Sequence, residues 1–108
     1  MRDAVGPVLR MGEEVELVIQ AIRDDNPERE LDVVDQGAYV RVQAEGRLRV
    51  TLATLRRYLG ASFQMRQLEG MLSAFAGRIV TGSEEISWSL GASAGDAAAA
   101  GAAKGERR

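Results

Sequence analysis

The stretch Ala38–Val50, AYVRVQAEGRLRV, alternates apolar and polar side chains on both sides of a Glu-Gly pair. A two-residue period of this kind is typical of strands that bury one face and leave the other in water. Two such runs joined by a short segment containing glycine favour a β-hairpin. We therefore predict an antiparallel hairpin, in which the inward residues are Val40, Val42, Ala44, Leu48, Val50 and Leu52.

Upstream of this stretch the period changes to that of a helix. Val15, Val18, Ile19 and Ile22 recur at the spacing of one helix face, and glutamates at 13, 14 and 16 occupy the expected first turn. The sequence DDNP at 24–27 is expected to end this helix.

Downstream, two further helices are predicted. Thr51 is placed to cap a helix over 52–59, which Gly60 ends. A second helix is expected over 64–76, with Gly77 as its C-terminal cap. Its buried stripe would comprise Met65, Leu68, Met71, Leu72, Phe75 and Ala76.

Short strands are expected near both ends of this pattern. Residues 5–10 form the first, with Pro7 at a sheet edge or strand start because proline has no N–H to donate. A strand at 31–33 and a final hairpin of 78–80 with 86–90 follow, and Trp88 faces inward in the latter. The order βαββ-ααββ predicts an α+β fold, with about three helices on an antiparallel sheet arranged in about two hairpin groups.

The 108 residues, 45% of them hydrophobic, suit one domain. We place that domain at 1–90 and expect the Gly/Ala-rich tail at 91–108 to be disordered, because it has no large apolar side chain. No apolar run follows Arg2, and no segment approaches the roughly 18 apolar residues of a membrane helix. A cytoplasmic protein without a membrane interaction is expected.

The charge and the residue types present narrow the function. Fourteen Lys and Arg against 16 Asp and Glu give a net charge of -2, so the chain has no overall attraction to nucleic acid. The absence of Cys and His excludes disulfides, Cys-based metal sites and His-dependent catalytic groups. Catalysis would depend on carboxylates, Lys104, Tyr or Ser.

The arginines near the predicted hairpin leave three interpretations open. Arg41, Arg47 and Arg49 are expected on its outer side, with Arg56 and Arg57 on the next helix and Tyr39 among them. They could keep this face solvated, meet a protein partner, or bind single-stranded RNA as an RNA-recognition domain does. A small enzyme that uses only carboxylates is a further alternative, although the acidic groups sit where solvated charge is expected.

Four blocks carry a resemblance to a known family. VGPVLRMGEEVELVIQAIRDDNP, AYVRVQAEG, LRVTLATLRRYLG and FQMRQLEGMLSAFAGRI are similar, in order and spacing, to the effector (coupling or regulatory) proteins of bacterial multicomponent di-iron monooxygenases. The similarity covers residues 5–90, and the toluene and aromatic monooxygenase branch is the one the chain resembles most.

The resemblance implies a non-enzymatic protein without a cofactor, monomeric when free. Its expected partner is the di-iron hydroxylase component, which it would bind above the metal centre to promote coupled oxygen activation and hydroxylation of aromatic hydrocarbons. No nucleic acid partner is expected.

A run of small residues is the candidate contact with the hydroxylase. Small side chains at Gly70, Ser73, Ala74 and Gly77 could serve close packing or let another backbone approach. The family segment that ends in small residues and Gly-Arg matches 73–78 here. The resemblance therefore implies the hydroxylase-binding candidates Ser73, Ala74, Phe75, Ala76, Gly77 and Arg78, and the small-residue pattern adds Gly70.

Overall fold

A computed structural model describes residues 3–90, so the disorder predicted for 91–108 lies outside the described residues. The elements run in the order strand, helix, three strands, two helices and three strands. Their bounds are β1 Ala4–Arg10, α1 Val15–Asp25, β2 Asp32–Asp35, β3 Tyr39–Glu45, β4 Arg47–Thr51, α2 Leu52–Leu59, α3 Met65–Met71, β5 Leu72–Ala76, β6 Arg78–Thr81 and β7 Glu85–Ser89.

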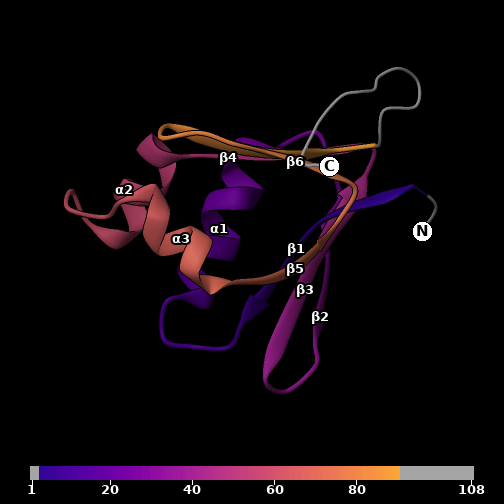
Figure 1. Cartoon of the computed structure of the whole chain (residues 1–108), viewed down its shortest axis with the longest axis horizontal. Coiled ribbons are helices and arrows are strands. Elements are labelled where there is room, and N and C mark those ends of the chain that lie inside the picture. Colours follow the sequence, from indigo (N-terminus) through magenta and orange to yellow (C-terminus); the bar gives the residue numbers. More distant parts are fainter. Residues whose placement is uncertain (1–2, 91–108) are drawn as a thin grey trace.

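The strands form two antiparallel sheets. One has four strands in the order β2-β3-β1-β5, and the other has three in the order β4-β7-β6. The predicted α+β class is confirmed, and so is the final hairpin, in which Arg78 pairs with Ser89 and Thr81 with Ile86. Figure 1 shows the three-stranded sheet lying across the end of the four-stranded one.

The predicted hairpin of 38–44 and 47–52 is wrong in its pairing. β3 pairs with β1 and β2, whereas β4 pairs with β7. Gly46 has a positive φ of 80°, and its N–H donates to the carbonyl of Asp3 instead of closing a hairpin. The alternation itself was interpreted correctly, because the predicted inward residues are buried in both strands. Both apolar faces reach the same core from different sheets.

Helix α1 lies in the middle of the molecule, between the two sheets and beside α2 (Figure 1). Its buried residues include Val18 and Ile22, each with no exposed surface. Trp88 of β7 is the largest fully buried side chain. Within residues 3–90 its indole N–H is buried without a hydrogen-bond partner, so the ring is held by packing.

The end of α1 is tied to β4 through a buried side chain. Asn26, which is 4% exposed, donates to the carbonyls of Ile22 and Arg49, both at 2.6 Å, and accepts from the N–H of Arg49 at 3.1 Å. The carboxylate of Asp25 accepts from the N–H of Thr51 at 2.7 Å. These bonds satisfy main-chain groups of β4, which is an edge strand, and fix the helix against it.

The caps of α2 agree with the sequence analysis. The hydroxyl of Thr51 accepts a hydrogen bond from the N–H of Thr54, and Gly60 ends the helix at φ 105°. Helix α3, by contrast, stops at Met71, and the predicted helix over 64–76 is wrong beyond that residue. Its last part is strand β5, which pairs with β1.

Tertiary pairing explains this difference. Residues 72–76 contain five small or apolar side chains, a run too short for periodicity to separate helix from strand. Pairing beside β1 satisfies main-chain groups that would otherwise form the open edge of the sheet. Gly70 also weakens the helical alternative, since glycine in a helix interior costs about 1 kcal/mol relative to alanine.

Pro7 lies inside a central strand, so its prediction at a sheet edge or strand start is wrong. β1 runs between β3 and β5. The β1–β3 ladder has pairs at Val5 and Val8 but none at Gly6 or Pro7. The ladder is therefore interrupted where the proline N–H is missing.

Removing the side chain of Asn26 tests the connection between α1 and β4. Asn26→Ala leaves the N–H and carbonyl of Arg49 without their partner, so we expect the free energy of unfolding to fall by about 3 kcal/mol. Urea unfolding followed by Trp88 fluorescence measures it. Gln20→Ala, at an exposed position of the same helix, is the control and should change stability by less than about 0.5 kcal/mol. Equal effects of the two substitutions would contradict the assignment.

Candidate docking surface

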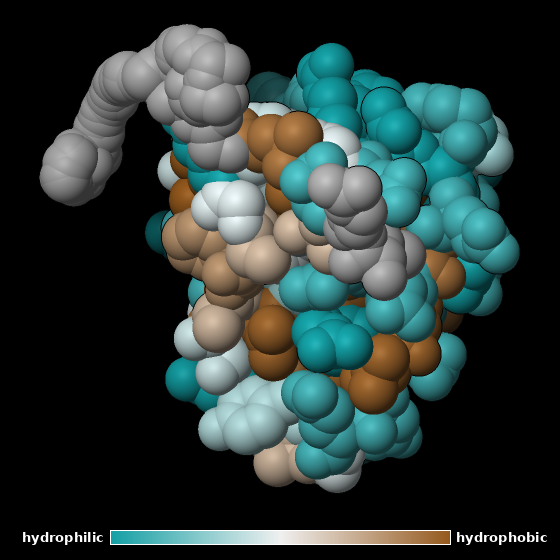
Figure 2. All heavy atoms as spheres, turned by 90° about the vertical axis from the view of Figure 1, so that its right-hand side faces the viewer, coloured by the Kyte–Doolittle hydropathy of each residue, from teal (hydrophilic) through white to brown (hydrophobic). Residues whose placement is uncertain are grey.

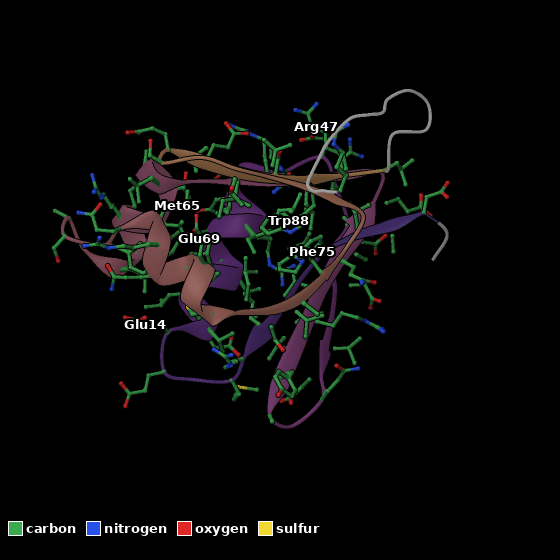
Figure 3. The ribbon with its side chains drawn as sticks, viewed as in Figure 1. Glu14, Arg47, Met65, Glu69, Phe75 and Trp88 are labelled. Atoms are coloured by element: carbon green, nitrogen blue, oxygen red, sulfur yellow. The ribbon has the colours of Figure 1, made fainter. Side chains whose placement is uncertain are left out.

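The candidate residues lie along one edge of the four-stranded sheet. Ser73, Ala74 and Phe75 are exposed on β5, and Ala76 is half-buried at its end. They were predicted at a helix end, whereas in the structure they lie on an edge strand. We call Ser73, Ala74 and Phe75 the β5 edge. Figure 3 shows Phe75 where β5 runs beside β1.

Gly70 precedes the β5 edge in the last turn of α3. Its carbonyl accepts a hydrogen bond of 2.8 Å from the guanidinium of Arg10, at the end of β1. A Cβ at this glycine would meet nothing within 4 Å, so it does not serve close packing within the chain. No pattern in the sequence indicated Arg10, whose hydrogen bond links the last turn of α3 to the end of β1.

Gly77 joins β5 to β6 and has a structural role. Its φ is 90°, and a Cβ there would lie 2.5 Å from the carbonyl oxygen of Ser89 and 2.6 Å from Cγ1 of Val5. Ser89 belongs to the three-stranded sheet and Val5 to the four-stranded sheet. Gly77 therefore marks the point where the two sheets touch, and close packing within this chain accounts for it.

The arginines do not share a surface. Arg41 lies on the four-stranded sheet, 3.9 Å from the carboxylate of Asp32, whereas Arg47 and Arg49 lie on the other sheet. Arg49 contacts Glu85 at 3.2 Å, and Arg47 points away from the molecule (Figure 3). The expectation that these side chains line one outer face is wrong, because their strands belong to different sheets. The basis for an RNA-binding face is lost with it.

Tyr39 and Trp88 do not form a pair of stacking rings on that face either. Tyr39 is 41% exposed, but Trp88 has no exposed surface. RNA-recognition domains stack two or three bases on neighbouring rings of one sheet. In the structure these two rings belong to different sheets, and one is inside the core.

Two carboxylates at the end of α1 make structural hydrogen bonds. Asp25 accepts from the hydroxyls of Thr51 and Thr54 at 3.1 and 2.8 Å. Asp24 accepts from the phenol of Tyr58, and this hydrogen bond raises the pKa of Tyr58 above its ordinary value. Within residues 3–90 no cluster of three or more acidic side chains is placed to hold a metal ion.

Further exposed apolar side chains lie outside the sequence-based candidates. Val80 on β6 is 55% exposed and Met11 is 42% exposed. Figure 2 looks onto the outer side of the four-stranded sheet, where pale and brown spheres gather on one side and teal ones on the other. The sequence could have indicated that Val80 is exposed, because residues two apart in a strand share a face and Val80 is two residues from the charged Arg78. In the part of the chain described, no helix is long and apolar enough to cross a membrane.

Comparison with known proteins relates this fold to one family. The model of the MmoB/DmpM family matches residues 3–89. The effector subunit of the alkene monooxygenase system of Xanthobacter autotrophicus (strain ATCC BAA-1158 / Py2) is 38% identical over 84 residues, which are 78% of this chain and 83% of that protein.

Solved structures show the same fold. A chain in a phenol hydroxylase–regulatory protein complex aligns with a TM-score of 0.64 and 26% identity, over 79% of this chain and 99% of that one. A second structure of such a complex gives a TM-score of 0.72 at 22% identity, covering 81% and 98%. Regulatory protein B of soluble methane monooxygenase gives 0.63 at 19%, covering 87% and 70%.

Alanine substitutions at Gly77 and Gly37 separate two effects on stability, namely the strain of a positive φ and the close contact between the two sheets. Gly37 also has a positive φ, 87°, but a Cβ there would meet nothing within 4 Å. We expect Gly37→Ala to lower the free energy of unfolding by about 1 kcal/mol and Gly77→Ala by at least about 3 kcal/mol, because only the second also forces the sheets apart. Chemical denaturation measures both. Equal losses would show that Gly77 is needed for its φ alone.

The hydrogen bond from Tyr58 to Asp24 predicts a pH dependence. Because the folded state raises the pKa of Tyr58, its contribution is complete below pH 10 and is lost as the pH rises through the folded-state pKa. We expect the native protein to be more stable than Tyr58→Phe at pH 8, and this difference to shrink above pH 10. Thermal unfolding of both proteins across this range measures it. A difference that does not depend on pH would contradict the assigned cause.

Proposed function

The chain belongs to the MmoB/DmpM family, and from this premise we propose that it is the effector subunit of a multicomponent di-iron monooxygenase. It binds the hydroxylase component and promotes coupled oxygen activation and hydroxylation without catalysing a reaction itself. The observation that carries this proposal is the 38% identity, over most of both chains, to a protein named as the effector subunit of an alkene monooxygenase system.

An effector acts through differential affinity for two states of its partner, and needs no reactive group of its own. This requirement is consistent with a chain that has no His and no Cys, and whose carboxylates Asp24 and Asp25 are engaged in structural hydrogen bonds. It also directs attention to exposed surface. The β5 edge, with Gly70 and Arg78 at its ends, is the docking surface we propose for the hydroxylase.

We propose aromatic hydrocarbons as the substrates of the assembled enzyme. The support is the resemblance of the sequence blocks to the toluene and aromatic branch, together with the 26% identity to a chain of a phenol hydroxylase–regulatory protein complex. Alkenes are the second candidate class, favoured by the relative from the alkene monooxygenase system. The effector does not carry the substrate site in either case, so the hydroxylase has to be present for a test.

Titration of this protein into a reconstituted monooxygenase tests the proposal. The assay contains the hydroxylase encoded in the same operon with its electron-transfer partners, and offers either toluene or propene. We expect a saturable rise in product per NADH, larger for toluene. A larger rise with propene would transfer the substrate assignment to alkenes. No rise and no binding, with a hydroxylase that responds to its own effector, would reject the pairing.

Introducing a long cation at the β5 edge tests the proposed surface. Ser73 is exposed, so Ser73→Arg should leave the unfolding transition unchanged while it obstructs a close contact. We expect the effector concentration for half-maximal stimulation to rise at least tenfold. Ser62→Arg, at an exposed position between α2 and α3, is the matched control and should behave as the native protein. Unchanged stimulation by a folded Ser73→Arg protein would remove this surface from the proposal.

A further inference from the structure

The two sheets have four edge strands, and one of them differs from the others in charge. β2 carries Asp at both ends, β4 carries two arginines and β6 begins with Arg78. β5 has the sequence LSAFA, and among the strands within residues 3–90 it alone has no charged residue. Natural proteins commonly protect an open edge with charged side chains, because an edge without them can pair with another chain.

The β5 edge is also accessible. Ser73 and Ala74 are exposed, and Phe75 has 46% of its surface exposed although it is a large apolar residue. Figure 2 shows that one side of this face of the molecule is more hydrophobic (pale and brown) than the other (teal). An uncharged and open edge in a soluble α+β domain indicates a surface kept for a partner.

The proline in β1 determines which main-chain groups of β5 face outward. Pro7 is the ladder partner of Phe75. Because proline has no N–H, Pro7 and Phe75 cannot exchange the two hydrogen bonds of a hydrogen-bonded pair. We therefore take them as a non-hydrogen-bonded pair. In an antiparallel ladder the N–H and carbonyl of such a residue are directed away from its partner strand. The N–H and carbonyl of Phe75 therefore point to the open side of the edge.

The surroundings of the β5 edge define the chemistry of its occupant. Arg10 lies at one end, bonded to the carbonyl of Gly70, and exposed Arg78 lies just beyond the other end. An extended segment that is uncharged in its middle and acidic at its flanks complements this arrangement. A second copy of this chain would bring its own arginines to the same ends.

The length of the edge also argues against pairing between two copies. The whole of β5, five residues, spans about 17 Å at roughly 3.4 Å per residue. Two such edges bury far less than the roughly 800 Å² per partner of a stable interface. A larger partner can contact the edge together with the surface around it.

We propose that the β5 edge binds the hydroxylase by strand addition, in which an extended hydroxylase segment forms main-chain hydrogen bonds with the N–H and carbonyl of Phe75. This inference rests on the proposed effector function and states the form of the contact. Main-chain pairing provides the affinity, and the exposed ring of Phe75 packs over the added strand.

Two substitutions at one position separate main-chain pairing from side-chain packing. Phe75→Pro removes both the ring and the outward N–H, whereas Phe75→Ala removes only the ring. Neither removes a hydrogen bond to β1, and proline is accepted on an edge strand when its N–H faces outward. We expect Phe75→Pro to bind the hydroxylase at least tenfold more weakly than Phe75→Ala, with folding of both verified through Trp88 fluorescence.

The outcomes are distinct. Equal binding by the two folded variants would overturn strand addition, whether or not both are weaker than the native protein, because the N–H would then make no contribution. Failure of the native protein to bind a hydroxylase that responds to its own effector would overturn the effector function, and strand addition with it.

Amide hydrogen exchange keeps the test decisive if Phe75→Pro does not fold. In the native protein we expect the Phe75 amide to exchange at least tenfold more slowly when the hydroxylase is bound than when the protein is free. The amide of Val33, on the charged edge strand β2, is the internal control and should not change. Unchanged exchange at Phe75 in a complex shown to be formed would overturn the proposal.

Discussion

The contact between the two sheets at Gly77 is the constraint on which the rest of the architecture depends. At this residue the chain leaves one sheet for the other, and the space between Val5 and the carbonyl of Ser89 admits no Cβ. This close contact holds the two sheets on either side of α1. The apolar side chains of α1 and of both sheets form one buried core. Without this contact, the core around Trp88 would open along the junction.

The opposite end of α1 is held by hydrogen bonds. Asn26 and Asp25 satisfy main-chain groups of β4, so the helix cannot shift without leaving buried donors and acceptors unpaired. The molecule is therefore closed by packing at Gly77 and by polar contacts at Asn26. Between them, β5 is left as an open edge of a sheet whose position is well determined. A rigid edge loses little conformational entropy when it binds a partner.

This arrangement suits a protein that acts by binding. Several ionisable groups of β4, α1 and β7 are engaged in structural contacts, such as Arg49 with Glu85 and Asp25 with Thr51. The exposed apolar side chains are spread over the sheets and their ends. Such a surface can regulate a partner that has two states. The regulation requires only that the surface binds one state of the partner more tightly than the other.

The sequence by itself determined the α+β class, helix α1, the caps of α2, the inward residues of β3 and β4, and the family, since these depend on local periodicity, local hydrogen bonds and the order of motifs. It also predicted a hydroxylase contact in the stretch that contains the β5 edge, which stays a prediction, and it assigned that stretch to a helix. Only the tertiary structure decided that 72–76 is a strand and that β3 and β4 separate into two sheets. Alternation specifies which side chains face the core, whereas the neighbour of a strand depends on residues far away in the chain, here Val5 and Trp88.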